Sequence, residues 1–427
     1  MSHQTAVLVV LMCMGPVRAH AQDPVQTPQA PATQQQQTVT EVVEAAGSDG
    51  DVPTSPFKKL NEYEWKHFSL RWGGGFLWDV AGYSQDDASK SQLKLTPTDG
   101  LRDFRLLFKG RLPIPRLTYT AGYMYDKASD TWQFRQTGVM FEIRKAHGSL
   151  FVGRTKEGFS TNKIMVGYQG WTIERAPMND AFVPILGDGV RWTGTVPNGK
   201  FVYDVGFFRD AWQKESFTKN DKQAAFRAVW LPNAGTERPL LHVAFESRFG
   251  KPKDGVLKYR SKPEAYLAQE YAVDTGEFAA KSATTYGVET YFRPGQLMFG
   301  MEYFFNRNDA ADVGDPSFHG GEVFVAYILT RETRPYNRRS ATFERVRPTD
   351  TVFGGGPGAW ELVLRYSYTD VNSGPIRGGT FWRITPMANW HLSGNVRLGL
   401  VYGYGSLNRF DTVGKTHFFQ SRIQFQL

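Results

Sequence analysis

The sequence predicts an all-β protein: a transmembrane antiparallel β-barrel of about 16 strands, with long extracellular loops and one loop folded into the lumen. Residues 417–427 alternate apolar with polar side chains up to a terminal hydrophobe, as a lipid-facing closing strand does. Alternating segments of about ten residues recur along the chain, which is the length that a tilted strand needs to cross the hydrocarbon. Short and long connections separate these segments, as they do in outer-membrane barrels.

The N-terminus has the pattern of an export signal. An apolar stretch, residues 6–14, precedes Ala19-His20-Ala21, which matches a small-x-small cleavage site. We expect residues 1–21 to be a signal peptide, with a buried N-terminal helix as the alternative. The single cysteine, Cys13, lies inside this segment, so a mature chain would lack thiols and Cys-based metal sites.

Residues 22–56 form a second region, rich in Gln, Pro, Thr and Ala, which we expect to be a disordered arm or tether. The remaining residues, 57–427, are assigned to the barrel. They carry a formal charge of +12, since residues 1–56 contribute one base and five acids to the total of +8. Such an excess suits nucleic acid, anionic head groups or small anions, and charge alone does not choose among them.

Individual strands show one apolar and one polar face. The clearest apolar faces belong to residues 117–125, 360–368 and 396–404, where tyrosines gather at the ends. Aromatic side chains at strand ends are typical of interfacial girdles. No later apolar run approaches the ~20 residues of a spanning helix, so helical membrane insertion is excluded. A soluble sandwich allows the same alternation and stays the alternative, although the pattern favours the barrel.

Connections come in two lengths. Short ones are expected at 113–115, 294–295 and 391–394, and long ones at 163–188, 251–281 and 330–357. Because outer-membrane barrels keep short turns on the periplasmic side, the long connections are assigned to the outside.

Placing each apolar face toward lipid directs a set of basic side chains into the lumen. Such cations select anions and phosphates in pores, because guanidinium and ammonium groups bind oxyanions. The same parity sends Asp103, Glu246, Glu289, Glu302 and Glu361 inward, so some cations pair across strands. The predicted inward cations are Arg71, Arg105, Lys109, Arg191, Arg227, Arg365, Arg383, Arg397 and Arg422.

Two further basic groups lie on long connections. Arg154 and Lys156 share strand parity at the start of the first long loop, so they are expected to project together into a constriction with Lys163 and Arg175; an ordinary solvated loop is the alternative. The second group is expected to collect anions at the outer mouth, to bind lipopolysaccharide phosphates or simply to be solvated. Its members are Arg331, Arg334, Arg338, Arg339, Arg345 and Arg347.

Motifs for chemistry are absent from the sequence: there is no Walker loop, HExxH, nucleophile elbow or Cys/His metal spacing. We therefore expect no catalytic residue, metal or cofactor. Three other functions stay open: an outer-membrane hydrolase with a His–Ser pair, a loop-closed barrel with a binding or structural role, and a soluble nucleic-acid binder. The last is disfavoured, because the aromatic side chains lie on the faces opposite the charges.

Several stretches resemble the phosphate-selective porin O and P family. The resemblance covers most of residues 66–427 and is strongest in the C-terminal third. The stretches that carry it are Gly358-Ala359-Trp360-Glu361-Leu362, Arg365-Tyr366-Ser367, Gly378-Gly379, Asn389-Trp390, Asn395-Val396-Arg397-Leu398, Thr330 to Tyr336, Arg260 to Glu264 and Asp274-Thr275-Gly276.

This resemblance implies a sixteen-stranded, usually trimeric channel of a Gram-negative outer membrane, in contact with lipid and lipopolysaccharide, that passes phosphate or polyphosphate. It also implies a general, less selective pore as the alternative. Leu101 to Arg105 looks like the family's paired-arginine strand, although Asp103 stands where a second cation is common. Arg154 and Lys156 match the entry to the constriction loop, whose usual lysine-rich signature is reduced here to Lys163 and Arg175.

Overall fold

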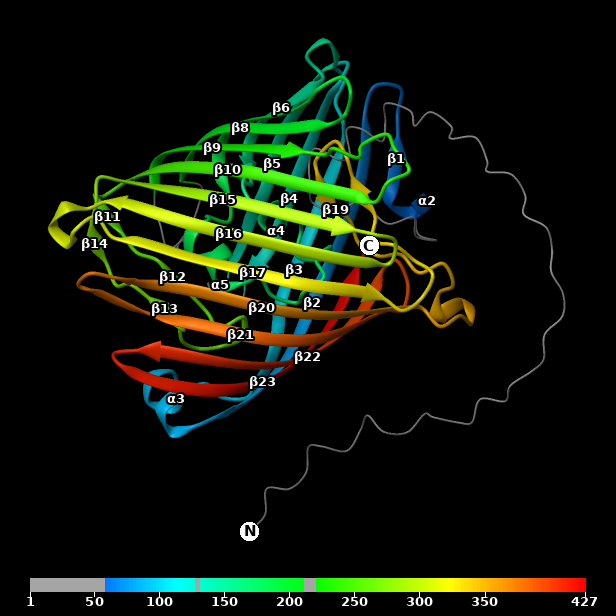
Figure 1. Cartoon of the computed structure of the whole chain (residues 1–427). Helices are drawn as coiled ribbons and strands as arrows, with labels where there is room; N and C mark the ends of the chain where they lie inside the picture. Colours follow the sequence, from blue (N-terminus) through cyan, green and yellow to red (C-terminus); the bar gives the residue numbers. More distant parts are fainter. Residues whose placement is uncertain (1–57, 127–130, 211–219) are drawn as a thin grey trace, which may run out of the picture. The chain divides into compact units, whose positions relative to one another are not determined.

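The computed structural model describes residues 58–126, 131–210 and 220–427, and it forms a closed β-barrel (Figure 1). Sixteen long strands pair antiparallel with their neighbours, and β23 pairs back with β2 to close the wall. These strands are β2 (Ser69–Gln85), β3 (Thr98–Arg111), β4 (Leu117–Asp126), β5 (Thr131–Ile143), β6 (Gly148–Thr155), β7 (Gly187–Thr195), β8 (Phe201–Asp210), β9 (Asn220–Trp230), β10 (Leu240–Pro252), β15 (Ser282–Arg293), β16 (Leu297–Asp309), β17 (Ser317–Ile328), β20 (Ala359–Ser373), β21 (Ile376–His391), β22 (Val396–Arg409) and β23 (Thr412–Gln426).

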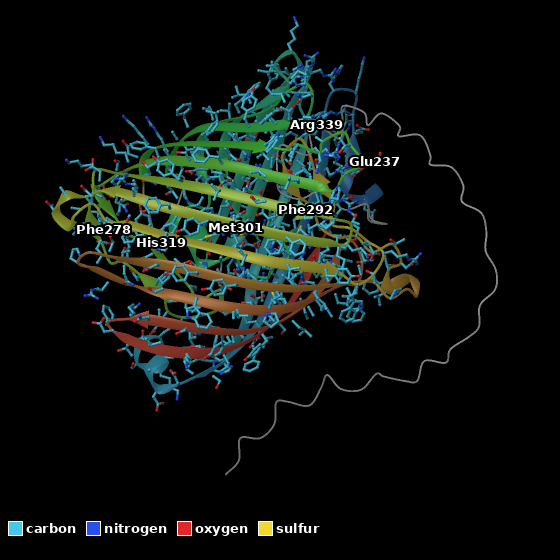
Figure 2. The ribbon with its side chains drawn as sticks, in the orientation of Figure 1. Glu237, Phe278, Phe292, Met301, His319 and Arg339 are labelled. Carbon is cyan, nitrogen blue, oxygen red and sulfur yellow. The ribbon has the colours of Figure 1, made fainter. Side chains whose placement is uncertain are left out.

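Alternation along each strand separates an outer apolar face from an inner face. In β16, Phe299, Met301 and Tyr303 are 45%, 38% and 41% exposed, whereas Glu302 and Phe304 between and beside them are buried. Figure 2 shows the outward side chains of Phe292 on β15 and Met301 on β16. Because successive side chains of a strand point to opposite faces, the outward set suits lipid and the inward set fills the lumen.

Shorter helices and strands lie in the connections and before β2. None of the helices in the described ranges is long and apolar enough to cross a membrane. These elements are α2 (Lys58–Asn61), β1 (Glu62–Glu64), α3 (Asp87–Gln92), η1 (Arg144–Ala146), α4 (Thr161–Ile164), α5 (Pro177–Phe182), β11 (Val256–Leu257), β12 (Arg260–Ser261), β13 (Val273–Asp274), β14 (Phe278–Ala279), η2 (Ala311–Val313), β18 (Tyr336–Asn337), β19 (Thr342–Phe343) and η3 (Val352–Gly354).

The two ends of the barrel differ. The turn end holds α2, the C-terminus and the short connections 112–116, 144–147, 196–200, 294–296 and 392–395, and the loop end holds the long connections 156–186 (loop L3) and 253–281 (loop L5) (Figure 1). One long connection, residues 329–358 (the turn-side segment), joins β17 to β20 at the turn end. The prediction that this long connection lies outside is therefore wrong, because an odd number of crossings separates it from loops L3 and L5.

Loops L3 and L5 and the turn-side segment fold into the lumen and build cores against the inner wall. Toward the loop end, Phe159, Met178 and Phe182 of L3 pack with Tyr259 of L5. Deeper, Trp171 of L3 packs against Phe324 of the wall and Phe343 of the turn-side segment, at ring distances of 4.5 and 5.8 Å. The predicted inward-folded loop is thus present, and two further segments accompany it.

Two inward glycines make room for loop L3. A Cβ at Gly75 would lie 2.9 Å from the Tyr168 ring, and a Cβ at Gly320 would lie 2.8 Å from Met178 Cβ. Both distances are too short for real atoms, so a side chain at either position would push the loop off the wall. Gly75, in the glycine run at 73–75, thus has a packing role.

The structure confirms the sixteen-stranded all-β barrel that the alternation predicts. The predicted signal peptide and arm, residues 1–56, lie outside the described residues and stay predictions.

Candidate permeation site

A row of carboxylates on the inner wall binds loop L3. Glu289, Glu302 and Glu322 lie directly opposite one another on β15, β16 and β17. The backbone N–H groups of Thr161 and Asn162 donate to Glu289 and Glu302 at 2.8 and 3.0 Å. Adjacent like charges in a buried row are unfavourable unless donors compensate them, and the first amides of α4 supply such donors. The acidic row is therefore a docking site for the loop.

Most inward arginines hold the inserted segments in place. Each is 5% exposed or less, and each donates to a carboxylate, a loop carbonyl or both. The pairs are Arg191 with Asp204 and the Lys156 carbonyl; Arg227 with Glu246, Glu289 and the Ala341 carbonyl; Arg365 with Glu264, Glu322 and the Glu174 carbonyl; Arg383 with Gln420 and the Pro263 and Glu264 carbonyls; Arg397 with Gln424 and the Gly170 carbonyl; and Arg422 with Asp79, Glu174 and the Ile173 carbonyl.

Three residues with left-handed backbone lie where wall side chains bind the inserted segments. Ser160, Glu264 and Ala341 have φ values of 65°, 55° and 50°. Such conformations cost a non-glycine residue about 1–3 kcal/mol and persist only where the surroundings fix them. Here Glu246 and Glu302 accept from Ser160, Arg365 and Ser367 donate to Glu264, and Arg227 donates to the Ala341 carbonyl. The inserted segments are rigidly built.

The basic cluster at 331–347 has a different location from the predicted one. It lies on the turn-side segment, so it is not at the mouth formed by L3 and L5. Arg334 is buried and donates to Glu361 at 2.6 and 2.8 Å and to the Gln169 carbonyl of L3 at 2.8 Å. Arg331 is exposed and pairs with Asp350. The prediction of an outer anion collector or lipopolysaccharide site at these residues is wrong.

A cavity of about 200 Å³ remains between loops L3 and L5 and the wall formed by β3 to β5. We call it the L3 cavity. Eight cations and four carboxylates line it, so it has a positive excess. The cations are Arg102, Arg105, Arg135, Lys156, Lys163, Arg175, Lys262 and Arg422, and the carboxylates are Asp103, Glu174, Asp180 and Glu264.

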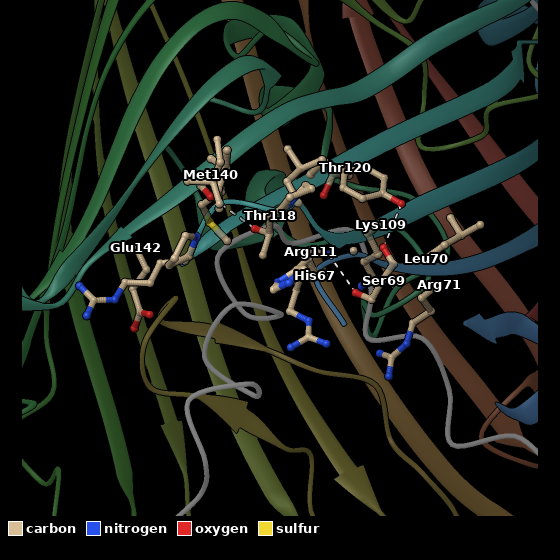
Figure 3. Close-up of a pocket in the computed structure, with 18 of the residues that line it drawn as sticks. His67, Ser69, Leu70, Arg71, Lys109, Arg111, Thr118, Thr120, Met140 and Glu142 are labelled. Atoms are coloured by element: carbon tan, nitrogen blue, oxygen red, sulfur yellow. Dashed lines mark hydrogen bonds between the residues drawn. The ribbon is translucent and has the colours of Figure 1, made fainter. Parts of the chain in front are cut away.

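A wider vestibule of about 910 Å³ opens at the turn end beneath β2 to β5 (Figure 3). Arg71 pairs there with Glu62 at 2.6 Å, and Lys109 also lines it. In all, six Lys or Arg residues and three Glu residues line the vestibule. The cations are Lys66, Arg71, Lys109, Arg111, Arg116 and Arg144, and the acids are Glu62, Glu64 and Glu142. Arg105 of the L3 cavity and Lys109 of the vestibule share the inner face of β3.

The alternation in the sequence did not predict that Arg102 and Arg135 line the L3 cavity. A β-bulge in each strand changes which of its residues face the lumen. In β3, Leu77 pairs with Asp103 and Trp78 with Leu101, so Arg102 is an extra residue and turns inward beside Asp103. In β5, Tyr123 pairs with Phe134 and Ala121 with Thr137, which turns both Arg135 and Gln136 toward the lumen. A bulge adds one residue to one strand, and a strict period of two cannot anticipate it.

Arg154 does not lie in the lumen. It pairs with Asp188 at 2.8 and 2.9 Å on the outer face, the face of Val152 and Val190, which are 44% and 39% exposed. Lys156 follows the strand end, lies inward and donates to the Ile164 and Met165 carbonyls. The prediction that Arg154 and Lys156 project together is wrong, since the chain leaves the strand between them.

Burial and neighbouring charges shift the pKa values of two charged groups in loop L3. Burial lowers the pKa of Lys163 to about 8, although Asp180 opposes the shift by accepting from Nζ at 3.0 Å; Arg175 and Arg135 add to the lowering. Burial alone would raise the pKa of Glu174, but Arg102 and Arg422 lower it to about 2. Glu174 therefore stays ionised at neutral pH, whereas Lys163 is near its titration point.

The selectivity for anions that the sequence predicts is expected to fall as the pH rises through about 8, because Lys163 then loses its proton and the L3 cavity loses one positive charge. The measurement is the reversal potential of the reconstituted channel in a KCl gradient between about pH 7 and 9. Lys163→Met should remove the step and keep the lower selectivity throughout. If the reversal potential of Lys163→Met changes with pH as much as that of the wild type, the change is due to another titratable group.

Four of the described histidines form hydrogen bonds with tyrosines or carboxylates. His242 contacts Tyr336 and Glu289, His391 contacts Glu361, and His319 and His417 contact Tyr303 and Tyr402. These are not the His–Ser contacts that the hydrolase alternative needs. Over the residues with described positions, no group of three or more His, Cys, Asp and Glu could hold a metal ion.

A sixteen-stranded barrel with an apolar outer wall, inserted loops and charged inner cavities is typical of the outer-membrane β-barrel channels. The chain belongs to the family described as phosphate-selective porin O and P, which matches residues 70–427. The resemblance that the C-terminal motifs indicated is confirmed, and the chain is an outer-membrane porin of a Gram-negative bacterium. Both family and fold are those of a channel rather than an enzyme.

Similar proteins include an uncharacterized protein of Caulobacter vibrioides (strain ATCC 19089 / CIP 103742 / CB 15), 28% identical over 246 residues. That match covers 55% of this chain and 49% of the other, so the chain spans about half the length of the curated relative. Among solved structures, the outer membrane channel DcaP of Acinetobacter baumannii is similar (11% identity, 86% and 99% of the two chains, TM-score 0.53). So is in-vitro folded OmpT of Vibrio cholerae in its trimer form (11%, 85% and 100%, TM-score 0.50). At these identities the two structures show the fold alone.

Proposed function

We propose that this porin conducts small anions, phosphate or polyphosphate among them, by passive diffusion along the β2–β5 wall. The observation that carries the proposal is the excess of eight cations over four carboxylates around the L3 cavity. Fixed charge has its largest effect where the path is narrow, because charges within a Debye length of about 8–10 Å act on every passing ion. The vestibule at the turn end has the same sign of excess and extends the path.

The test is the reversal potential of the full chain in a planar bilayer under a KCl gradient. An anion-selective potential is expected, and a cation-selective one would overturn the proposal. Neutralising Arg105 or Arg135 with Gln should move the potential toward zero, because each removes one charge from the L3 cavity. Arg377→Gln is the matched control, since Arg377 is 62% exposed at the loop end and pairs with Asp411.

A loop-closed barrel with a binding or structural role is the second candidate. The observation that favours it is the filling of the lumen by L3, L5 and the turn-side segment, with cores against the inner wall. A closed barrel gives no conductance in the same bilayer, so the one recording separates the two functions. Block of chloride current by added phosphate then tests the phosphate preference.

We also propose a homotrimer, with lipid and lipopolysaccharide around the rest of the wall. Two observations support a protein contact at β6 and β7: these strands have only eight and nine residues, and the ion pair Arg154–Asp188 lies on their outer face. A charged pair and a short wall suit a neighbouring copy better than hydrocarbon. In the full chain, Val152→Cys should cross-link copies, and Ile423→Cys on β23 should not.

A further inference from the structure

The hydrogen-bonding edges of the cavity arginines are already used within the protein. Arg102 Nε donates to Glu174 at 3.0 Å, and Arg105 Nε donates to Asp103 at 3.0 Å. Arg175 donates to the Asn162 and Met165 carbonyls at 2.6 and 2.9 Å. Inorganic phosphate is bound best by pairs of N–H donors that replace its hydration shell. These arginines supply positive potential, but their N–H donors already bind carboxylates and carbonyls of the protein.

The carboxylates in the same cavity act against a compact, highly charged ligand. Asp103, Glu174, Asp180 and Glu264 all line it, beside the cations that they contact. Coulombic repulsion from each carboxylate grows with the charge of the ligand and falls with distance. An anion that keeps its charged group near the β3–β5 wall and places a neutral body elsewhere avoids much of this repulsion.

The loop side of the cavity offers an apolar surface for such a body. Val166, Ile173, Val183, Pro184 and Ile185 of L3 line it. Tyr266 of L5 lies beneath the Arg102 guanidinium, whose central carbon is 3.7 Å from the ring centre. This stacking holds the guanidinium flat, and flat guanidinium and aromatic surfaces bind planar groups well.

We propose, on the basis of the anion-channel function above, that the L3 cavity prefers organic anions with a flat apolar body to inorganic phosphate. Aryl phosphate monoesters and aryl carboxylates belong to this class. The charged group lies toward Arg105 and Arg135, and the apolar body lies against Ile185 and the Arg102–Tyr266 stack. The cavity volume of about 200 Å³ accommodates a single aromatic ring with its charged group.

The test compares three blockers of chloride current that share one charged group: inorganic phosphate, methyl phosphate and phenyl phosphate. Phenyl phosphate should block at a concentration about tenfold lower than the other two, which corresponds to burial of roughly 55 Å² of apolar surface. Equal or stronger block by inorganic phosphate would overturn the proposal. A cation-selective reversal potential in the same bilayer would instead overturn the anion-channel function, so the two failures are distinguishable.

Variants locate the site. Tyr266→Leu should lower the preference for phenyl over methyl phosphate severalfold, and Tyr266→Phe, which keeps the ring, should retain it. Chloride conductance of each variant shows that the channel has formed. If Tyr266→Leu gives no channel, Ile185→Asn tests the other side of the cavity, with the same expected loss of preference. A wild-type preference in the variant that conducts would overturn the assignment of the apolar body to this surface.

Discussion

Arg227→Met is expected to destabilise the barrel by about 3–5 kcal/mol, the usual effect of removing one partner from a buried charge cluster. Arg227 is completely buried on β9 and donates to Glu246 at 3.1 Å and to Glu289 at 2.8 and 2.5 Å. It also donates to Thr161 Oγ1 at 2.6 Å and to the Ala341 carbonyl at 3.1 Å, so it joins the wall, loop L3 and the turn-side segment. Without it, two carboxylates lose their main counter-charge. Urea unfolding of the detergent-solubilised protein, followed by tryptophan fluorescence, gives the free energy.

Arg331→Met is the matched control, because its pair with Asp350 is at 2.9 Å but is 83% and 52% exposed. Exposed pairs contribute about 0–1 kcal/mol, so this variant should unfold almost as the wild type does. Adding Glu246→Gln and Glu289→Gln to Arg227→Met should recover part of the loss, because the buried charges then disappear together. A loss no greater than that of Arg331→Met would show that the cluster does not hold the segments.

Local sequence patterns predicted the barrel well because lipid imposes one rule on every strand. The outward residues must be apolar, and a period of two then fixes the inward ones, as Arg365, Glu361 and Arg422 illustrate. The rule fails at bulges, which is why Arg102 and Arg135 were missed. The rule also fails at the loop end of β6, where a charged residue, Arg154, faces outward. Its partner Asp188 lies directly opposite on β7.

The filling of the lumen was not predictable from alternation. A water-filled pore needs polar inner faces, yet Phe304, Phe318 and Phe324 point inward and are buried under the inserted segments. Their partners are distant in sequence, as in the contact of Trp171 with Phe324. One local signal was present: Phe304 and Phe305 are adjacent apolar residues on a strand, so one of them must face the lumen. Inward glycines such as Gly320 were a second signal of close approach.

Trp171→Ala is expected to release the deep part of loop L3 and to raise single-channel conductance severalfold, with lower anion selectivity. Trp171 is fully buried and contacts Phe324, Tyr291 and Phe343, so it joins the loop to the wall and to the turn-side segment. Truncating a buried aromatic residue to alanine removes about 3–5 kcal/mol of packing. The strand pairing does not pass through this residue, so the barrel should stay closed while the loop loosens.

Phe353→Ala is the control for this change, because Phe353 lies in the turn-side segment but is 71% exposed. It should conduct as the wild type does. Selectivity should fall in Trp171→Ala because a wider path places ions more than a Debye length, about 10 Å at 0.1 M salt, from the arginines of β3 and β5. Wild-type conductance together with wild-type selectivity in Trp171→Ala would mean that the clamps from Arg334, Arg397 and Arg422 hold the loop without its aromatic core.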